Sequence, residues 1–159
     1  MINTVRILNT QISETSVKEV SSYLIDNNSL KVAICNTNTV VRSYKNNELG
    51  NLINSFDIKT SDGFPIAKSS SILYKNNQER VDGYNVFLST IREGLTNDTS
   101  HYFFGSQESI LNKLEAKLKD MFPDINIKGS FSPPQGDPKE LVKEEYIKNI
   151  IKEKPDIVW

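Results

Sequence analysis

The sequence predicts a single domain of the α/β class, spanning residues 1–159, in which a mostly parallel sheet carries helices on both faces. Short apolar segments alternate along the chain with amphipathic helical segments, and this alternation is typical of βαβ units. The 159 residues are enough to bury one sizeable core. The hydrophobic share of 37% and the charged share of 25% are ordinary for a folded globular protein.

The first half of the chain contains apolar segments that read as buried strands, at residues 5–8, 31–35 and 56–60. Ser16-Val17-Lys18-Glu19 has the form of a capping box, and it starts a helix whose inner face carries Val20 and Leu24. Asn46-Asn47 separates two short helices, and Pro65 occupies the first turn of the next. These helices are expected at residues 39–44, 48–53 and 65–73.

The second half repeats the alternation. A helix over residues 84–94 is expected to stop at Gly94, and Ser106 is expected to cap the helix that Pro123 stops. That later helix carries apolar residues at helical spacing, namely Ile110, Leu111, Leu114, Leu118 and Met121. Asp137 and Pro138 have the pattern of an N-cap and a first turn for the last helix. The expected strands cover residues 101–104, 125–127 and 155–159.

The apolar segment Ile157-Val158-Trp159 stands at the very end of the chain. Because termini are usually exposed and frayed, a chain that stops within a hydrophobic strand is expected to be truncated. A short edge strand that completes the sheet is the alternative. An unfinished sheet edge would also favour self-association into a homo-oligomer.

Composition excludes several classes of function. The net charge of −1, with Lys and Arg spread along the chain, argues against nucleic acid as a partner. One His and one Cys do not build a common zinc site, so no metal is expected. The single Cys35 fits a reducing cytoplasm. No apolar run approaches the ~20 residues that span a bilayer and no signal peptide is recognisable, which leaves open a peripheral contact at the inner face of the membrane.

Asp62 is the first candidate site residue. It lies in Ser61-Asp62-Gly63-Phe64-Pro65, directly after an expected strand, and open α/β sheets bind ligands beyond the carboxyl ends of their strands. Asp-Gly pairs are also ordinary turn formers, which is the alternative reading. The segment Glu79-Arg80-Val81-Asp82-Gly83 follows and supplies an arginine. No Gly-x-Gly-x-x-Gly follows the first strand, so an unrelated dinucleotide-binding domain has little support.

Seven segments, in this order and at this spacing, resemble the WecG/TagA/CpsF glycosyltransferase family. They are Ile34-Cys35-Asn36-Thr37-Asn38, Ser61-Asp62-Gly63-Phe64-Pro65, Glu79-Arg80-Val81-Asp82-Gly83, Phe103-Phe104-Gly105-Ser106, Phe122-Pro123-Asp124-Ile125-Asn126-Ile127, Ser132-Pro133-Pro134 and Lys154-Pro155-Asp156-Ile157-Val158-Trp159. The resemblance implies a Rossmann-like α/β fold. It also implies transfer of an amino sugar, commonly N-acetylmannosamine, from UDP with inversion and without a metal or other cofactor. The products of such transfer are cell-surface polymers such as teichoic acid linkage units and capsule.

The resemblance also implies roles for individual residues. Asp62 would be the general base that takes the proton of an acceptor hydroxyl. Arg80 would meet diphosphate or carboxylate oxygens, although it would equally suit a surface ion pair. Further substrate contacts are implied at positions near these two and at a later turn: Asn36, Thr37, Asn38, Gly63, Gly83, Gly105 and Ser106. The two asparagines would otherwise only shape a turn, and Gly105 would only end a strand.

The sequence departs from the family pattern at two places. Ile34 stands where relatives often have a sugar-pocket Thr, a role that falls to Thr37 if the loop shifts. Relatives also continue past the Pro155–Trp159 segment into elements that complete the nucleotide-sugar site. The first hypothesis is an inverting transferase that uses a lipid-linked or glycan acceptor. The second is a truncated, catalytically inactive module for sugar-nucleotide binding or assembly.

Overall fold

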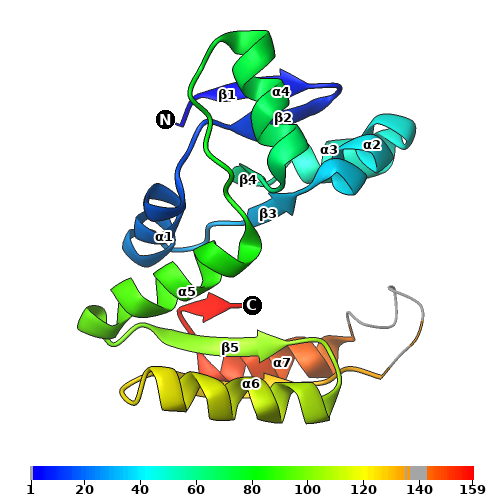
Figure 1. Cartoon of the computed structure of the whole chain (residues 1–159). Helices are drawn as coiled ribbons and strands as arrows, with labels where there is room; N and C mark the ends of the chain where they lie inside the picture. Colours follow the sequence, from blue (N-terminus) through cyan, green and yellow to red (C-terminus); the bar gives the residue numbers. More distant parts are fainter. Residues whose placement is uncertain (1, 135, 137–142) are drawn as a thin grey trace. The chain divides into compact units, whose positions relative to one another are not determined.

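The computed structural model describes residues 2–134, 136 and 143–159. Contacts between residues divide the chain into two compact units, Met1–Thr90 (unit 1) and Ile91–Trp159 (unit 2). The strands form separate small sheets, in which parallel pairs predominate and helices alternate with strands (Figure 1). The predicted α/β class, with its Rossmann-like character, is confirmed.

Unit 1 is built on two strand pairs. Its described strands are β1 (Thr4–Ile7), β2 (Thr10–Ser13), β3 (Val32–Cys35) and β4 (Ile58–Ser61). β1 and β2 form an antiparallel hairpin, whereas β3 and β4 run parallel with Cys35 opposite Ser61. β2 was not predicted from the sequence. Of its residues only Ile12 is apolar, so hydrophobic alternation gives no signal there, although Thr10 and Ser13 are fully buried.

The helices of unit 1 are α1 (Val17–Asp26), α2 (Thr37–Lys45), α3 (Asn47–Asn54), α4 (Phe64–Tyr74) and the start of α5 (Gly83–Gly94). Short polar side chains cap these helices, except α4, which has Gly63 at its N-cap and no side-chain cap. The predicted capping box is confirmed, because Ser16 Oγ accepts from Glu19 N at 3.2 Å and Glu19 Oε2 accepts from Ser16 N at 2.8 Å. Asn46 Oδ1 accepts from Leu49 N at 3.1 Å, which caps α3 and accounts for the predicted break after α2.

The core of unit 1 lies where the hairpin, the β3–β4 pair and the helices meet. One buried cluster contains Val5, Ile7, Ile12, Ala33, Cys35, Val40 and Ile66. A second contains Val20, Ile58, Val81 and Val86. The last residue of α4 is fixed to the hairpin, since the Tyr74 hydroxyl donates to Arg6 O at 2.6 Å and accepts from Arg6 N at 3.2 Å. These bonds hold the C-terminal end of α4, while Ile66 in its first turn, near Asp62, packs in the first cluster.

Unit 2 contains a three-stranded parallel sheet in the order β6-β5-β7. Its described elements are η1 (Leu95–Asn97), β5 (Ser100–Phe104), α6 (Glu108–Met121), β6 (Asn126–Phe131), α7 (Glu144–Glu153) and β7 (Ile157–Val158). Ser130 of β6 hydrogen-bonds Glu115 of α6, and the next residue, Phe131, packs on Tyr146 of α7 with ring centroids 4.7 Å apart. Since neighbouring strand residues face opposite ways, α6 and α7 cover opposite faces of this sheet (Figure 1).

The predicted final strand is confirmed as a partner of β5. Trp159 N donates to Tyr102 O at 2.8 Å, and Phe104 N donates to Trp159 O at 2.8 Å. The predicted helix start at Asp137 and Pro138 lies outside the described residues. Within unit 2 the sheet thus places the carboxyl end of β5, with Gly105 directly after it, beside the end of β6.

Candidate functional site

Asp62 lies at the carboxyl end of β4, beside the end of β3. Its backbone N–H donates to Cys35 O at 3.1 Å, which continues the parallel register by one residue and brings Asp62 next to Asn36. Gly63 follows with φ of +89°, a conformation that lets the chain turn directly into α4 and that other residues adopt only with strain. The Asp62 side chain is half-buried, and no hydrogen bond from the described residues occupies its carboxylate. Within the described part of the chain, this carboxylate is therefore not committed to a structural hydrogen bond.

Cys35, beside Asp62, is a buried thiol. It is fully buried, and burial raises its pKa to about 11, with the Lys59 charge opposing the rise and the Asp62 charge adding to it. The thiol therefore stays protonated and is a poor nucleophile near neutral pH. Its packing role is the one expected from its apolar strand.

Asn36 caps α2 with its side chain. Its Oδ1 accepts from Thr39 N at 3.0 Å and from Thr39 Oγ1 at 3.3 Å. The turn-shaping alternative is therefore observed for the Asn36 oxygen, and the side-chain amide nitrogen remains as a donor. Thr37 and Asn38, in the first turn of α2, are exposed. All three side chains thus lie at the helix start that follows β3.

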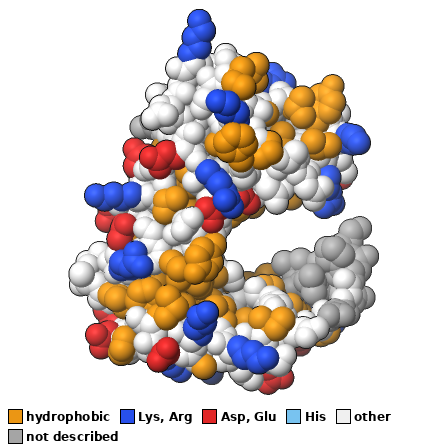
Figure 2. Space-filling model, viewed as in Figure 1, with side chains coloured by type: hydrophobic (Ala, Val, Ile, Leu, Met, Phe, Trp, Pro, Cys, Tyr) orange, Lys and Arg blue, Asp and Glu red, His pale blue; other side chains and the backbone are white. Residues whose placement is uncertain are grey.

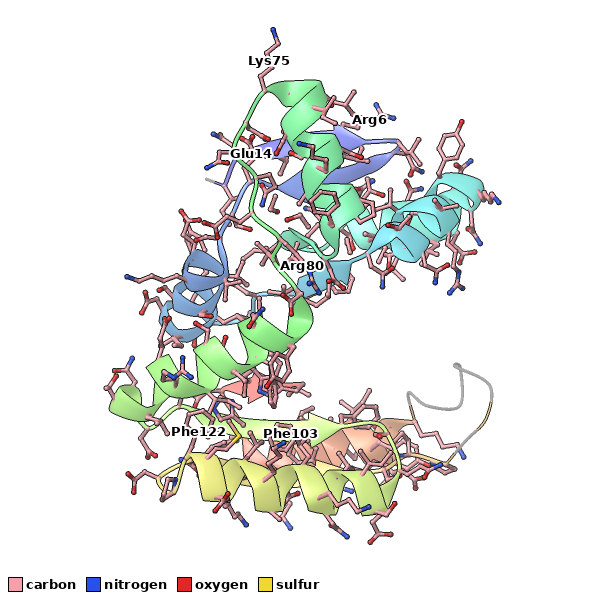
Figure 3. The ribbon with its side chains drawn as sticks, in the orientation of Figure 1. Arg6, Glu14, Lys75, Arg80, Phe103 and Phe122 are labelled. Atoms are coloured by element: carbon pink, nitrogen blue, oxygen red, sulfur yellow. The ribbon has the colours of Figure 1, made fainter. Side chains whose placement is uncertain are left out.

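Arg80 is held beside β4 by its two neighbours. Ser61 Oγ donates to Glu79 O at 2.6 Å, and Val81 N donates to Ser61 O at 3.1 Å, so the Arg80 backbone lies alongside the residue that precedes Asp62 (Figure 3). The side chain is 60% exposed, and its Nε lies 3.9 Å from Asp82 Oδ2. An exposed pair at this distance contributes little and leaves most guanidinium donors available to an anion.

Asp82, which was not recognised from the sequence as a site residue, orders the segment after Arg80. Asp82 accepts from Asn85 N at 3.1 Å and from Asn85 Nδ2 at 2.7 Å, and so caps α5. Burial works to raise its pKa, but the Asn85 hydrogen bonds and the Arg80 charge together lower it, so the carboxylate stays ionised. Asp-Gly directly before an apolar helical pattern is an N-cap signal that would have identified it. Gly83, the next residue, lies beside Ile34, since a Cβ added to it would meet Ile34 Cγ2 at 3.5 Å.

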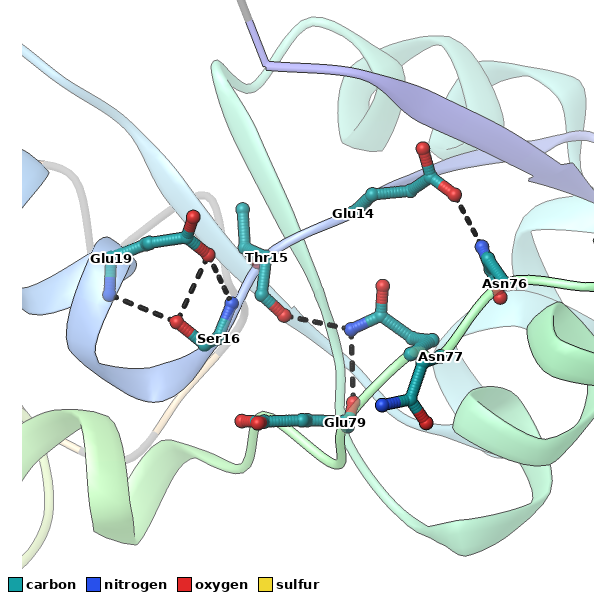
Figure 4. Close-up of a pocket in the computed structure, with 8 residues that line it drawn as sticks. Glu14, Thr15, Ser16, Glu19, Asn76, Asn77 and Glu79 are labelled. Atoms are coloured by element: carbon teal, nitrogen blue, oxygen red, sulfur yellow. Dashed lines mark hydrogen bonds between the residues drawn. The ribbon is translucent and has the colours of Figure 1, made fainter.

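A polar pocket of about 240 Å³ lies beside the segment that leads to Arg80 (Figure 4). Its lining comes from residues 14–16, Glu19 and residues 76–79. Glu14 accepts from the Asn76 amide, and Gln78 Nε2 donates to Thr15 O at 2.8 Å and to Ser61 Oγ at 3.0 Å. These bonds tie the chain before Arg80 to β4 and to the segment after β2.

Gly105 and Ser106 lie in unit 2, at the turn between β5 and α6. Gly105 N donates to Phe131 O at 2.9 Å, and both residues have positive φ, +117° and +64°. The prediction that Ser106 caps α6 is wrong. Gln107 occupies the N-cap without a side-chain bond, because the left-handed backbone at Ser106 turns its carbonyl toward Ser132 Oγ, which donates to it at 2.7 Å.

The same turn borders a cavity of about 710 Å³ in unit 2. It is lined by residues that surround the helix start: Phe104, Gly105, Ser106, Gln107, Ile110, Pro133, Pro134 and Gly136. The apolar walls and the amino end of a helix suit a ligand with both a flat apolar part and an anionic group. The apolar lining residues were not singled out from sequence as site residues, although the Pro133-Pro134 loop marked a break in the pattern.

His101 is a packed residue of β5, as its position in an aromatic strand predicted. Its Nδ1 accepts from Trp159 Nε1 at 3.1 Å, and the side chain is 1% exposed. Burial lowers its pKa to about 4, against the opposing charge of Asp156.

Within residues 2–134, 136 and 143–159, no group of His, Cys, Asp and Glu side chains is arranged to hold a metal ion. No helix in those ranges combines the length and apolar character needed to cross a membrane.

Comparison with known proteins supports the family resemblance seen in the seven sequence segments. A curated relative in Bacillus spizizenii, an N-acetylglucosaminyldiphosphoundecaprenol N-acetyl-beta-D-mannosaminyltransferase, is 23% identical over 109 residues. The match covers 69% of this chain and 42% of the relative, so the chain matches less than half the length of that protein. The family model described as "Glycosyl transferase WecG/TagA/CpsF family" matches residues 5–159, which include Asn36, Asp62 and Arg80. The chain therefore belongs to the WecG/TagA/CpsF family of glycosyl transferases.

Proposed function

We propose that this chain forms part of an inverting glycosyltransferase. It transfers an N-acetylmannosamine-type sugar from a UDP-sugar to a lipid-linked or glycan acceptor during cell-surface polysaccharide or teichoic acid synthesis. The observation that best supports this proposal is the register of β3 and β4, which brings Asp62 beside Asn36. Ser61 also hydrogen-bonds the residues on either side of Arg80. Family membership and the name of the Bacillus spizizenii relative support the reaction class.

Asp62 acts as the general base in this proposal. An acceptor hydroxyl is a poor nucleophile until a carboxylate within hydrogen-bond reach takes its proton. The hydroxyl oxygen forms a bond to the anomeric carbon as the bond from that carbon to the UDP oxygen breaks. The electron pair of the breaking bond leaves with UDP, and the proton goes to Asp62. Attack opposite the leaving group inverts the anomeric centre.

The remaining proposed residues bind the donor. Arg80 has guanidinium donors to spare beyond its long contact with Asp82, and these suit the diphosphate oxygens. The Asn36 amide, with Thr37 and Asn38 beside it, suits sugar hydroxyls. Gly63 shapes the backbone after Asp62, and Gly83, which lies beside Ile34, is proposed to allow close approach of the backbone to the donor. Gly105 and Ser106 are proposed contacts for an anionic group of the donor. The reaction is proposed to need no cofactor, with the UDP-sugar as substrate.

Replacing Asp62 by asparagine tests this role. Asp62→Asn keeps the size of the side chain but removes its basicity, so transfer should fall by about 10²-fold or more while the circular dichroism spectrum is unchanged. Asp26→Asn, an exposed aspartate at the end of α1, is the matched control and should retain full activity. UDP release from a UDP-sugar and a water-soluble acceptor analogue is the measurement. Near-normal turnover by Asp62→Asn would remove Asp62 from the mechanism.

A binding or assembly module without turnover is the second candidate, because the chain matches 42% of its curated relative. Isothermal calorimetry with UDP-sugars separates the two candidates. Binding without UDP release by the 159-residue chain supports the module, whereas turnover by that chain eliminates it.

A further inference from the structure

Helix α4 exposes large apolar side chains on its solvent side. Phe64 is 72% exposed, and Ile72 and Leu73 are each 65% exposed, while Ile66 and Ala67 form the buried side. A surface helix normally carries polar and charged residues opposite its buried face. α4 instead exposes three large apolar side chains to solvent, in addition to those that it buries.

Three of the exposed residues lie along one side of the helix. Phe64, Lys68 and Ile72 are spaced four residues apart, so they line this side. Leu73 and Lys75 are exposed at the C-terminal end of the helix. We call these five residues together, Phe64, Lys68, Ile72, Leu73 and Lys75, the α4 face. Figure 2 shows hydrophobic side chains alternating with Lys and Arg side chains over this part of unit 1.

The charges on the α4 face are all positive. Lys68 is the one charged residue between Phe64 and Tyr74, and Lys75 follows directly at the left-handed C-cap. Arg6 of β1 is held at the same end of the helix by its backbone bonds to the Tyr74 hydroxyl (Figure 3). The chain as a whole carries a net charge of −1, so this concentration of positive charge is local.

We propose that the α4 face contacts an anionic lipid surface. Phe64, Ile72 and Leu73 enter the boundary between headgroups and acyl chains, and Lys68 and Lys75 approach the lipid phosphates. The choice of a lipid surface rests on the proposed function, because a lipid-linked acceptor stays anchored in the bilayer. Phe64 is two residues beyond Asp62, so this docking brings the proposed base close to the headgroup layer, where such an acceptor presents its sugar.

Vesicle sedimentation of the 159-residue chain tests the proposal. The chain should bind vesicles of phosphatidylcholine with phosphatidylglycerol, bind phosphatidylcholine alone weakly, and lose binding as salt is raised. Lys68→Gln and Lys75→Asn should each weaken partition into anionic vesicles about fivefold. Ile72→Ser should weaken it about tenfold.

Matched controls come from other exposed positions of the chain. Ile151→Ser replaces an isoleucine that is 64% exposed on α7, and Lys117→Gln replaces an exposed lysine on α6. Both should bind vesicles as the unmodified chain does. Equal binding by the α4 variants and these controls, or no binding to anionic vesicles, overturns the proposal. A lipid-free dimer that Ile72→Ser converts to monomer, seen by light scattering, also overturns it, because the α4 face would then bind a second copy.

The vesicle result is separable from the proposed reaction. Ile72→Ser should leave transfer to a water-soluble acceptor analogue unchanged. If vesicle binding fails while Asp62→Asn abolishes transfer, the lipid contact is wrong and the proposed function stands. If the α4 variants lose vesicle binding while Asp62→Asn turns over normally, the lipid contact stands and the role of Asp62 is wrong.

Discussion

The Ser61 hydroxyl donates to the carbonyl oxygen of Glu79 at 2.6 Å. This bond joins the last residue of β4 to the residue before Arg80, across a gap of 18 positions in the sequence. The Gln78 amide donates to the same Ser61 oxygen at 3.0 Å, so one buried hydroxyl both donates and accepts. Ser61 therefore contributes directly to the relative placement of Asp62, the proposed base, and Arg80, which is proposed to bind the diphosphate.

Replacing Ser61 by alanine should destabilise unit 1 and weaken donor binding together. The change leaves the Gln78 amide without one of its acceptors inside the protein, at a cost of about 1–3 kcal/mol in the free energy of unfolding. Urea unfolding measures this cost, and calorimetry with a UDP-sugar measures binding. Ser55→Ala is the control, because the Ser55 hydroxyl also donates to a carbonyl, Leu52 O at 2.7 Å, but is exposed. Equal losses in the two variants would contradict the prediction.

Replacing Arg80 should weaken donor binding without changing stability. The side chain is 60% exposed and its ion pair is long, so Arg80→Gln should leave the free energy of unfolding unchanged. Losing charge-assisted bonds to a diphosphate should raise the Kd for the UDP-sugar about tenfold. Arg80→Lys should recover only part of the loss, because an ammonium cannot form the guanidinium fork. Arg42→Gln, on α2, serves as the exposed control, and unchanged affinity in Arg80→Gln would exclude Arg80 from the donor site.

Replacing Gly63 by alanine should destabilise the protein through the backbone. Gly63 has φ of +89°, where a Cβ is strained whatever space surrounds it, so Gly63→Ala should cost about 1–3 kcal/mol. Gly83→Ala is the control. Gly83 is the first residue of α5, and its added Cβ would only make ordinary contact with Ile34 at 3.5 Å, so that change should be neutral or slightly stabilising. Equal unfolding midpoints in guanidinium chloride would show that Gly63 is not strained.

Acid should destabilise the protein through His101. Its pKa is about 4 in the folded protein and near 6.5 in the unfolded chain, so the unfolded state binds the proton first as pH falls. Well above pH 6.5 His101 is unprotonated in both states and the effect is nil. Between about pH 6.5 and pH 4 stability should fall, by up to about 3 kcal/mol.

The matched variant for this pH effect is His101→Gln. Its side-chain oxygen can still accept the Trp159 indole N–H, but it does not titrate. Stability measured by urea unfolding at several pH values should fall less steeply in the variant through this window. Identical dependence of stability on pH in the variant and the unmodified protein would assign the loss of stability in acid to other groups. Asp156 would then be the first candidate, because hydrogen bonds from Ser100 lower its pKa.

Local signals in the sequence predicted most of the fold. Ser16 and Glu19 satisfy one another's backbone within a single turn, so their four-residue pattern sufficed to place α1. β2 was not predicted because its burial comes from tertiary packing. Thr10 and Ser13 are buried by the helices and by β4, a fact that no local pattern contains. Ser106 was misread for a related reason, since its left-handed backbone follows from the Gly105 turn and the bond from Ser132.

The candidate site was predictable in part. Asp62 could be recognised because it follows a strand and precedes a glycine, and both of those features are local. The neighbours of Arg80 could not, because the bonds that hold them come from Ser61 and from the Glu14–Thr15 segment, far away in sequence. Asp82 carried an N-cap signal, but only the structure shows that its carboxylate also lies near Arg80.

The Tyr74 phenol has a further effect on the hairpin of unit 1. A strand at the margin of a sheet is a template for aggregation, because its outward N–H and C=O groups can recruit a strand from another molecule. Tyr74 occupies both of these groups at Arg6, near the middle of β1. The protein thus blocks intermolecular strand addition at that point with one aromatic hydroxyl, where many proteins rely on a proline or an inward-pointing charge.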